Sequence, residues 1–318
     1  KLIQNIQIQS SEIESVEFSP DGKLLVTSSW DGNAKIKIWD VTSGKELFNF
    51  EGHKSRITSA EFSPDGKMIV TSSMDGSAKL WDIISGKLIF SFDGHKYGVE
   101  LSKFSPDGKM VVTATNRFLN FWDITTGDFK FNLKKPKDGF GAESVEFSQD
   151  GSKILSTSYN NLFFWDLLSG NTLTSLKDTE FRYNDIKSSE FSPDGNMIVT
   201  ASKNGTAKIW DVLTGDDIHN LIGHTRPVYS AGFSPDGSII ISSSYDGNIK
   251  LFDLFTGQFI LNLKDNIDKF VSVKFSPDES LILTKSYIPK IWDAQTGEIK
   301  YNLGEYINEE YTTEFSTD

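Results

Sequence analysis

The sequence predicts an all-β fold built from seven repeats, each of them a four-stranded antiparallel sheet. Three observations support this prediction. Three short markers recur in constant order along the chain. The stretches between the markers are short runs rich in β-branched and aromatic residues, bounded by residues that favour turns. No stretch shows a sustained helical period in its apolar residues.

The first marker of each repeat is the phrase Phe-Ser-Pro-Asp-Gly, which recurs every 42 to 44 residues. Pro fixes its own φ angle, Asp favours turns, and Gly tolerates a positive φ, so we expect a tight turn at each copy. Five complete copies and two near-copies begin at Phe18, Phe62, Phe104, Phe147, Phe191, Phe233 and Phe275.

The second marker is a Trp-Asp dipeptide, and the third is a Ser/Thr-Gly pair that follows it. In the first repeat the β-rich runs are residues 16–18, 24–28, 35–39 and 46–50. Asp-Gly and Asn-Gly dipeptides, which favour tight hairpins, separate the second and third runs of several repeats. The aromatic residues of the second marker are Trp39, Trp81, Trp122, Trp165, Trp210, Phe252 and Trp292.

A four-stranded sheet cannot bury both of its faces alone, whereas sheets stacked around an axis can cover one another. The large aromatic residue of the second marker suits the gap between two such sheets. With this period and this dipeptide, the chain resembles the WD40-repeat family over its whole length. The resemblance implies a seven-bladed β-propeller with a central channel, formed by residues 1–318 as one domain.

The two ends of the chain fit the repeats less well. In the family, one terminus usually adds a strand to the blade that the other terminus begins. We therefore expect residues 1–9 to complete the blade that contains Trp292. Residues 304–318 are either the start of an eighth repeat or the lead into a further domain. The missing initial Met suggests either a trimmed chain or a piece of a longer chain.

The composition narrows the class of protein and of partner. The chain has 44 acidic and 32 basic side chains and a net charge of −12, which argues against nucleic acid as the main ligand. No apolar run is long enough to cross a bilayer. The chain has no cysteine, which excludes disulfides, thiolate catalysis and cysteine-based zinc sites. This composition suits a reducing cytosol, and we predict a cytoplasmic location.

The polar residues of the repeat are better explained by structural roles than by catalytic ones. In the WD40 family a histidine, a hydroxyl residue, the hairpin aspartate and the tryptophan form a hydrogen-bonded tetrad, and one complete set here is His53, Ser73, Asp75 and Trp81. His224, Ser244 and Asp246 form a second set with Phe252 in the Trp place, while His95 faces Asn116 instead of an aspartate. Because these residues recur with the fold, a Ser-His-Asp triad is rejected. The Trp-Asp carboxylates also recur with the fold, so paired acids for a glycosidase are rejected too. We predict no enzyme activity, no metal and no cofactor.

The candidate binding residues are those that break the repeat on one exposed edge. By family analogy, one rim of the propeller carries the loops into each first strand and the hairpins between second and third strands. Aromatic residues, Met and Arg, which are enriched at protein interfaces, gather there. The predicted partner-binding residues are Trp30, Arg56, Met74, Tyr97, Phe140, Arg182, Tyr183, Arg226, Tyr245 and Tyr287, with Tyr159 and Lys203 at similar positions.

The sequence thus predicts a non-catalytic scaffold that binds a protein or peptide on this rim. It can also be the sensor or docking arm of a longer protein. Two alternatives stay open: a purely structural element of a larger assembly, and an enzyme with a site in the central channel. The sequence does not identify the partner.

Overall fold

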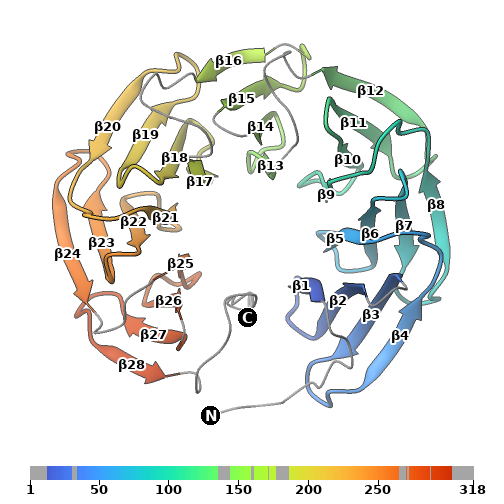
Figure 1. Ribbon diagram of the computed structural model, residues 1–318, viewed down its shortest axis with the longest axis horizontal. Coiled ribbons are helices and arrows are strands. Elements are labelled where there is room, and N and C mark those ends of the chain that lie inside the picture. The colour runs from blue at the N-terminus through green and yellow to red at the C-terminus, as the bar shows by residue number, and fades with distance from the viewer. Residues whose placement is uncertain are drawn as a thin grey trace. The chain divides into compact units, whose positions relative to one another are not determined.

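A computed structural model describes residues 13–30, 34–134, 144–158, 161–170, 172–176, 186–264, 270, 272–286 and 288–302. It confirms the predicted fold class, because these residues form seven four-stranded antiparallel sheets and no helix (Figure 1). We call each sheet a blade and number the blades in chain order. In this part of the chain no helix exists that could span a membrane.

The chain divides into two compact units, unit 1 and unit 2, between Phe147 and Ser148. The single domain predicted over residues 1–318 is not tested by this division and stays a prediction. The predicted closing strand at residues 1–9 and the end segment 304–318 lie outside the described residues.

Unit 1 contains the first three blades and the strand β13 (Ser144–Phe147). Blade 1 consists of β1 (Ile13–Phe18), β2 (Leu24–Trp30), β3 (Ala34–Asp40) and β4 (Glu46–Phe50). Blade 2 consists of β5 (Ile57–Phe62), β6 (Met68–Ser73), β7 (Ala78–Asp82) and β8 (Leu88–Phe92). Blade 3 consists of β9 (Leu101–Phe104), β10 (Met110–Ala114), β11 (Phe118–Asp123) and β12 (Phe129–Lys134).

Unit 2 contains the remaining strands. Blade 4 combines β13 with β14 (Lys153–Ser158), β15 (Asn161–Asp166) and β16 (Thr172–Leu176). Blade 5 consists of β17 (Ile186–Phe191), β18 (Met197–Ser202), β19 (Ala207–Asp211) and β20 (Asp217–Leu221). Blade 6 consists of β21 (Val228–Phe233), β22 (Ile239–Ser244), β23 (Asn248–Asp253) and β24 (Phe259–Lys264). Blade 7 consists of β25 (Ser272–Phe275), β26 (Leu281–Lys285), β27 (Lys290–Asp293) and β28 (Ile299–Asn302).

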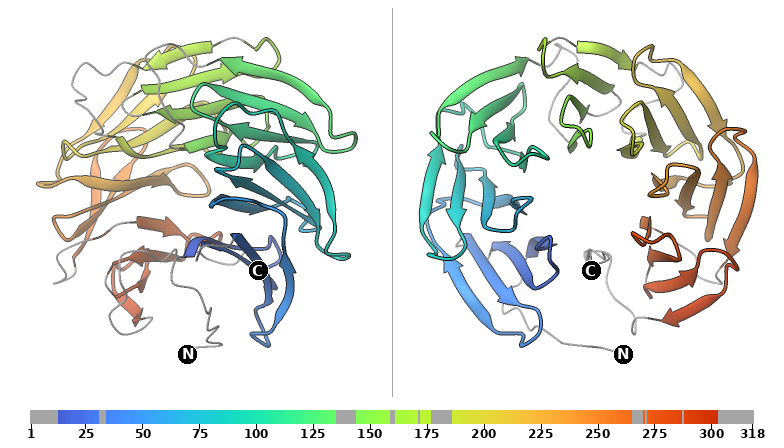
Figure 2. Two further views of the ribbon diagram at one scale, coloured as in Figure 1. Left: turned by 45° about the vertical axis from the view of Figure 1, so that its right-hand side comes forward. Right: turned by 180° about the vertical axis from the view of Figure 1, so that it is seen from behind.

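The strands of each blade pair in chain order as a meander. Within each unit, consecutive blades lie side by side, with the first strands along one edge and the fourth strands along the other (Figures 1 and 2). The first marker closes the turn after each first strand, as Ser19 shows. Its hydroxyl donates to Asp21 at 2.7 Å and accepts from the backbone N–H of Leu24 at 2.9 Å. Gly22 supplies the positive φ of 66° that this turn needs.

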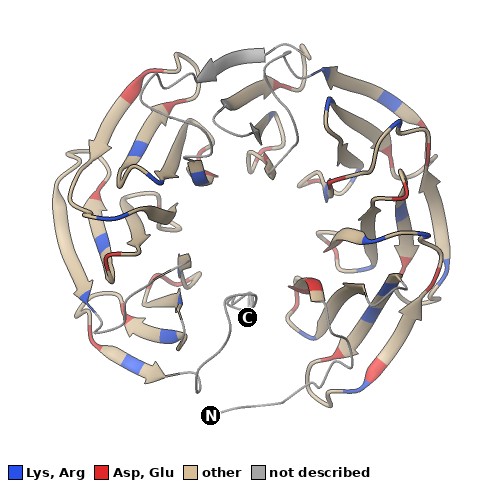
Figure 3. Cartoon of the chain, in the orientation of Figure 1, with Lys and Arg blue, Asp and Glu red and all other residues tan. Residues whose placement is uncertain are grey.

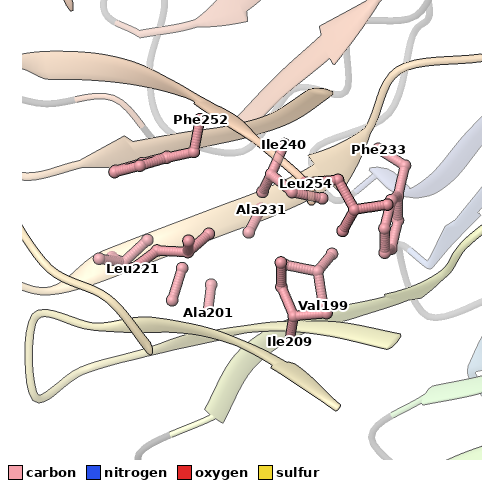
Figure 4. Close-up of a cluster of buried hydrophobic side chains, with 11 residues drawn as sticks. Val199, Ala201, Ile209, Leu221, Ala231, Phe233, Ile240, Phe252 and Leu254 are labelled. Carbon is pink, nitrogen blue, oxygen red and sulfur yellow. The ribbon is translucent and has the colours of Figure 1, made fainter. Parts of the chain in front are cut away.

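The hydrophobic core lies between consecutive blades, where each blade covers the face of its neighbour. In unit 2, one cluster joins blades 5 and 6 and includes Ile209, Ala231 and Phe252 (Figure 4). In unit 1, Trp81 of blade 2 packs on Phe50 of blade 1, with ring centroids 5.3 Å apart. The predicted place of the marker aromatic residue, in the gap between two blades, is thereby confirmed.

A glutamate on the first strand also links neighbouring blades. Its carboxylate accepts a hydrogen bond from the backbone N–H of the phenylalanine that begins the next turn marker. Glu61 reaches Phe104 at 3.2 Å, and Glu190 reaches Phe233 at 3.1 Å. A side chain on Gly232 would lie 3.0 Å from the Glu190 carboxylate, so glycine leaves room for this link.

Candidate functional site

The polar cluster of blade 2 is a chain of hydrogen bonds. The indole N–H of Trp81 donates to the Thr71 hydroxyl at 2.9 Å, and that hydroxyl lies 2.9 Å from Nε2 of His53. Nδ1 of His53 lies 3.0 Å from the Asp75 carboxylate. The place predicted for Ser73 is therefore taken by Thr71. The Ser73 hydroxyl instead donates to the Ser55 carbonyl at 3.1 Å.

The charge state of this cluster follows from its burial. Burial lowers the pKa of His53, although the hydrogen bond and the charge of Asp75 act in the opposite direction. Burial also acts to raise the pKa of Asp75, but hydrogen bonds from Ser77, the backbone N–H of Lys54 and His53 lower it to about 2. A neutral imidazole therefore donates from Nδ1 to a carboxylate and accepts from Thr71 at Nε2. This arrangement holds the strands together, and the Thr71 hydroxyl on His53 is fully buried and also accepts from the Trp81 indole.

Blades 3 and 6 repeat this cluster with changes. In blade 6, His224 contacts Asp246 at 3.0 Å and the Ser242 hydroxyl at 2.9 Å, so Ser242 replaces the predicted Ser244. In blade 3, His95 contacts the Thr113 hydroxyl at 2.9 Å, and its Nδ1 lies 3.1 Å from the carbonyl oxygen of Gly76. A backbone carbonyl of blade 2 thus stands where an aspartate carboxylate stands in the other two blades.

The structure brings three of the predicted binding residues together in unit 1. The backbone N–H of Met74 donates to the Arg56 carbonyl at 2.9 Å, and the Met74 side chain lies against Gly98, next to Tyr97. Met74 and Tyr97 are 49% and 46% exposed, which is high for such large apolar side chains. We call Arg56, Met74 and Tyr97 the hairpin surface of unit 1. Trp30, at the end of β2, is partly exposed.

The Arg56 guanidinium on this surface is already engaged. Its Nε and Nη2 atoms lie 2.6 Å and 2.7 Å from the two carboxylate oxygens of Glu14 on β1. Such a two-point contact fixes the plane of the guanidinium. Sequence reasoning missed Glu14. Like Thr58 of blade 2, it sits at the irregular pair near the start of its first strand, where residue types differ between repeats.

In unit 2, Tyr245 is the equivalent of Met74, and Arg226 stands one position before Pro227, which is the equivalent of Arg56. We call Arg226, Tyr229 and Tyr245 the hairpin surface of unit 2. The backbone N–H of Tyr245 donates to the Pro227 carbonyl at 3.1 Å. The Tyr245 ring stacks on Tyr229, with centroids 4.1 Å apart and an angle of 11° between the planes. Tyr229 was missed from the sequence, and it occupies the same irregular position as Glu14. Arg226 is exposed, as is Lys203 on the hairpin of the preceding blade.

Four of the predicted binding residues lie outside the described residues: Phe140, Arg182, Tyr183 and Tyr287, as does Tyr159. Within the described ranges, no group of three or more His, Asp or Glu side chains is placed to hold a metal ion.

A second set of exposed apolar residues was not expected from the sequence. It lies in the turns between third and fourth strands, where the side chains project into solvent. In unit 2, Leu168, Leu213 and Phe255 are 92%, 76% and 79% exposed. Ile84 of unit 1 is 79% exposed at the equivalent position. The sequence feature that could have predicted them is the apolar residue two positions after the Trp-Asp or Phe-Asp dipeptide in these repeats.

Comparison with known proteins gives three findings. The family model for WD40, described as WD domain, G-beta repeat, matches residues 1–40, 44–82, 86–123, 171–211 and 215–253, which is more than half of the chain. A crystal structure of the computationally designed Ika8 protein is 27% identical with a TM-score of 0.75, over 92% of this chain and 87% of that one. No curated protein matches the chain.

The unmatched stretches include most of blade 4 and all of blade 7, yet both have the same four-stranded order as the matched blades. Their turn markers depart from the common phrase, as Gln149 and Glu279 show. Altogether 1875 chains of solved structures match, so likeness of fold alone does not select one function. The chain belongs to the WD40-repeat family, and its fold is a β-propeller of seven four-stranded antiparallel blades.

Proposed function

We propose that the chain is a non-catalytic recognition domain that binds a protein or peptide through its hairpin surfaces. Membership of the WD40-repeat family indicates a protein-interaction scaffold. The observation that supports a specific surface is the exposure of Met74 and Tyr97 beside Arg56. These three side chains stand on hairpins and loops that backbone hydrogen bonds hold in place, so little entropy is lost when a partner binds.

The chemistry of the two surfaces suits a partner with apolar and acidic side chains. Tyr245 and Tyr229 present a stacked aromatic pair, which offers rigid contact area. Arg226 stands beside them for a carboxylate of the partner. Arg56 is oriented by Glu14 in advance, so a partner carboxylate at that place would compete with Glu14.

The exposed turn residues favour a second candidate function, a structural element that docks by its turn-bearing edge. Leu168, Leu213 and Phe255 lie in three consecutive blades of unit 2 at equivalent turn positions. An exposed apolar patch that several such side chains form together often marks a contact site. This candidate predicts that changes at the hairpin surfaces leave binding intact.

One capture experiment separates the two functions. Wild type and two variants are used to capture partners from a lysate of source cells, and partners are identified by mass spectrometry. The hairpin variant carries Met74→Ala, Tyr97→Ala, Arg226→Glu and Tyr245→Ala. The turn variant carries Leu168→Ser, Leu213→Ser and Phe255→Ser, all at exposed positions, and serves as the matched control.

We expect the hairpin variant to lose a partner that wild type and the turn variant both retain, with binding weakened at least about tenfold. Loss in the turn variant alone would overturn the proposal in favour of the structural role. Circular dichroism of all three proteins checks that the blades are intact.

A further inference from the structure

Blade 3 carries a pocket of about 500 Å³ within unit 1. It lies between the loop that follows β8 and one face of β11 and β12. The floor is aromatic, with Trp122 and Phe129 in edge-to-face contact at 5.5 Å. The polar lining includes Asp93, Asn120 and Asn132. This volume is typical of a site for a small ligand or for side chains of a peptide.

The pocket lies where blade 3 lacks a long side chain that most of the repeats carry. Five blades have a lysine two residues before the marker aromatic residue: Lys37, Lys79, Lys208, Lys250 and Lys290. Figure 3 shows basic residues on β3, β7, β19 and β23, whereas β11 has none. Blade 3 has Asn120 at this position, and blade 4 fills it with the buried ring of Phe163.

The glycine of each Gly-His pair gives a second, independent sign of the empty space. A Cβ atom on Gly52 would lie 3.1 Å from the Trp81 ring and 3.9 Å from Lys79, and one on Gly223 would lie 3.5 Å from Lys250. A Cβ atom on Gly94, which lines the pocket of blade 3, would meet nothing within 4 Å. Gly94 has a φ of 96°, against 154° for Gly52 and 152° for Gly223, so a different loop backbone as well as the shorter side chain leaves open space beside Gly94.

The sister blades show what this space holds. The Lys37 ammonium lies 5.4 Å from the centre of the Trp39 ring, and that of Lys208 lies 5.3 Å from Trp210. The Lys250 ammonium lies 5.0 Å from Phe259, which is the blade 6 equivalent of Phe129. In each case a cation lies within the distance at which aromatic rings attract it. The alkyl stem of such a lysine covers apolar surface on the way.

We propose that this pocket binds a lysine side chain of a protein partner, in the place that the chain's own lysine takes in the sister blades. The ammonium lies over the Trp122 and Phe129 rings. Asp93 and the amide oxygens of Asn120 and Asn132 accept its hydrogen bonds. The net charge of −12 favours the approach of such a cationic group.

Two basic residues at the pocket determine which residues can flank the partner's lysine in its sequence. Lys96 and Arg117 are exposed and line the pocket, and the Lys96 ammonium lies 5.7 Å from the Tyr97 ring. They would repel an isolated cation, so they select a segment in which acidic residues flank the lysine. The partner sequence is therefore of the type Glu-Lys-Glu, with the glutamates paired to Lys96 and Arg117.

The pocket is tested with the peptide acetyl-Gly-Glu-Lys-Glu-Gly-amide, without any cellular partner. Binding is followed by the NMR signal of the Trp122 indole N–H, assigned with a Trp122→Phe variant. We expect this signal to shift on titration of wild type. Asn120→Lys, which restores the side chain of the sister blades, and Asn120→Met, an uncharged filler of similar length, should each weaken binding about tenfold.

Thr125→Lys is the matched control, because it adds the same charge on an exposed turn of the same blade. It should bind like wild type. A peptide with Nε-acetyl-lysine should bind about tenfold more weakly than the lysine peptide. The proposal is overturned if Asn120→Met binds as wild type does, or if the acetylated peptide binds equally well. Because no variant here alters the hairpin surfaces, failure of this test leaves the proposed function untouched.

Discussion

A single hydroxyl group in blade 2 joins two side chains from different parts of the repeat. The Thr71 hydroxyl accepts from the Trp81 indole and contacts Nε2 of His53, and His53 in turn contacts Asp75. Thr71 and the His53 side chain are wholly removed from solvent, so neither the Thr71 hydroxyl nor the His53 ring nitrogens can turn to water instead. The cluster therefore depends on the hydroxyl of Thr71.

Thr71→Val removes this hydroxyl with little change of shape. The Trp81 N–H and the His53 Nε2 atom then lose a partner inside the protein, and the free energy of unfolding should fall by about 2 to 3 kcal/mol. Thr27→Val is the matched control. Among the described residues, the Thr27 hydroxyl accepts a hydrogen bond from the Trp39 indole at 2.9 Å and contacts no histidine. Urea denaturation should show a loss of about 1 kcal/mol for the control. Equal losses for the two variants would contradict the role given to Thr71.

At the scale of elements, the glutamate links hold first strands of neighbouring blades together. Glu61 on β5 accepts from the backbone N–H of Phe104 on β9. Burial raises the pKa of Glu61 to about 7, although Lys103 and this hydrogen bond act to lower it. A pKa above the ordinary value of 4.5 means that the folded state binds a proton that the unfolded state releases. The stability due to Glu61 is therefore complete below the ordinary pKa and is lost as the pH rises through about 7.

Glu61→Gln removes this titration and keeps a hydrogen-bond acceptor. The difference in free energy of unfolding, variant minus wild type, should rise by on the order of 2 kcal/mol between about pH 5 and about pH 8. The histidines change the stability in the opposite direction. Burial lowers the pKa values of His53 and His224, so their contribution to stability is lost as the pH falls. Taking the difference between the two proteins cancels their contribution. A difference that stays flat with pH would show that Glu61 is ionised in the folded state throughout.

The elements were the part of the structure that the sequence predicted well. Local chemistry determines them: the Ser-Pro-Asp-Gly turn needs only its own residues, as Ser19 and Gly22 show. The choice of Thr71 over Ser73 was not predictable, because both are buried hydroxyl residues two positions apart on the same face of β6. The exposure of Met74 and Tyr97 followed from the repeat pattern. The pairing of Arg56 with Glu14 did not, because it joins residues from two different repeats.

For the whole molecule, the excess of acidic residues makes the folded chain repel itself. With a net charge of −12, this repulsion should weaken as salt screens it, over a Debye length of about 10 Å at 0.1 M. The melting temperature should therefore rise by a few degrees between about 20 mM and about 300 mM NaCl. Scanning calorimetry checks this, with KCl as the control for a specific effect of sodium. A melting temperature that falls with both salts would mean that favourable ion pairs outweigh the repulsion.

The difference between lysine and Asn120 at this position is one that a single mutation can produce. The codons of lysine and asparagine differ only in their third base, so one point mutation converts either residue into the other. Five blades carry lysine at this position, and in each of them one such mutation would shorten the side chain beside the marker ring. The backbone pairing there is unaffected by the exchange, since Asn120 pairs with Asn132 in the same register as Lys208 with Asn220. A recognition site can thus arise in one blade or be lost from another by a single-base change that leaves the strand pairing of the blade as it was.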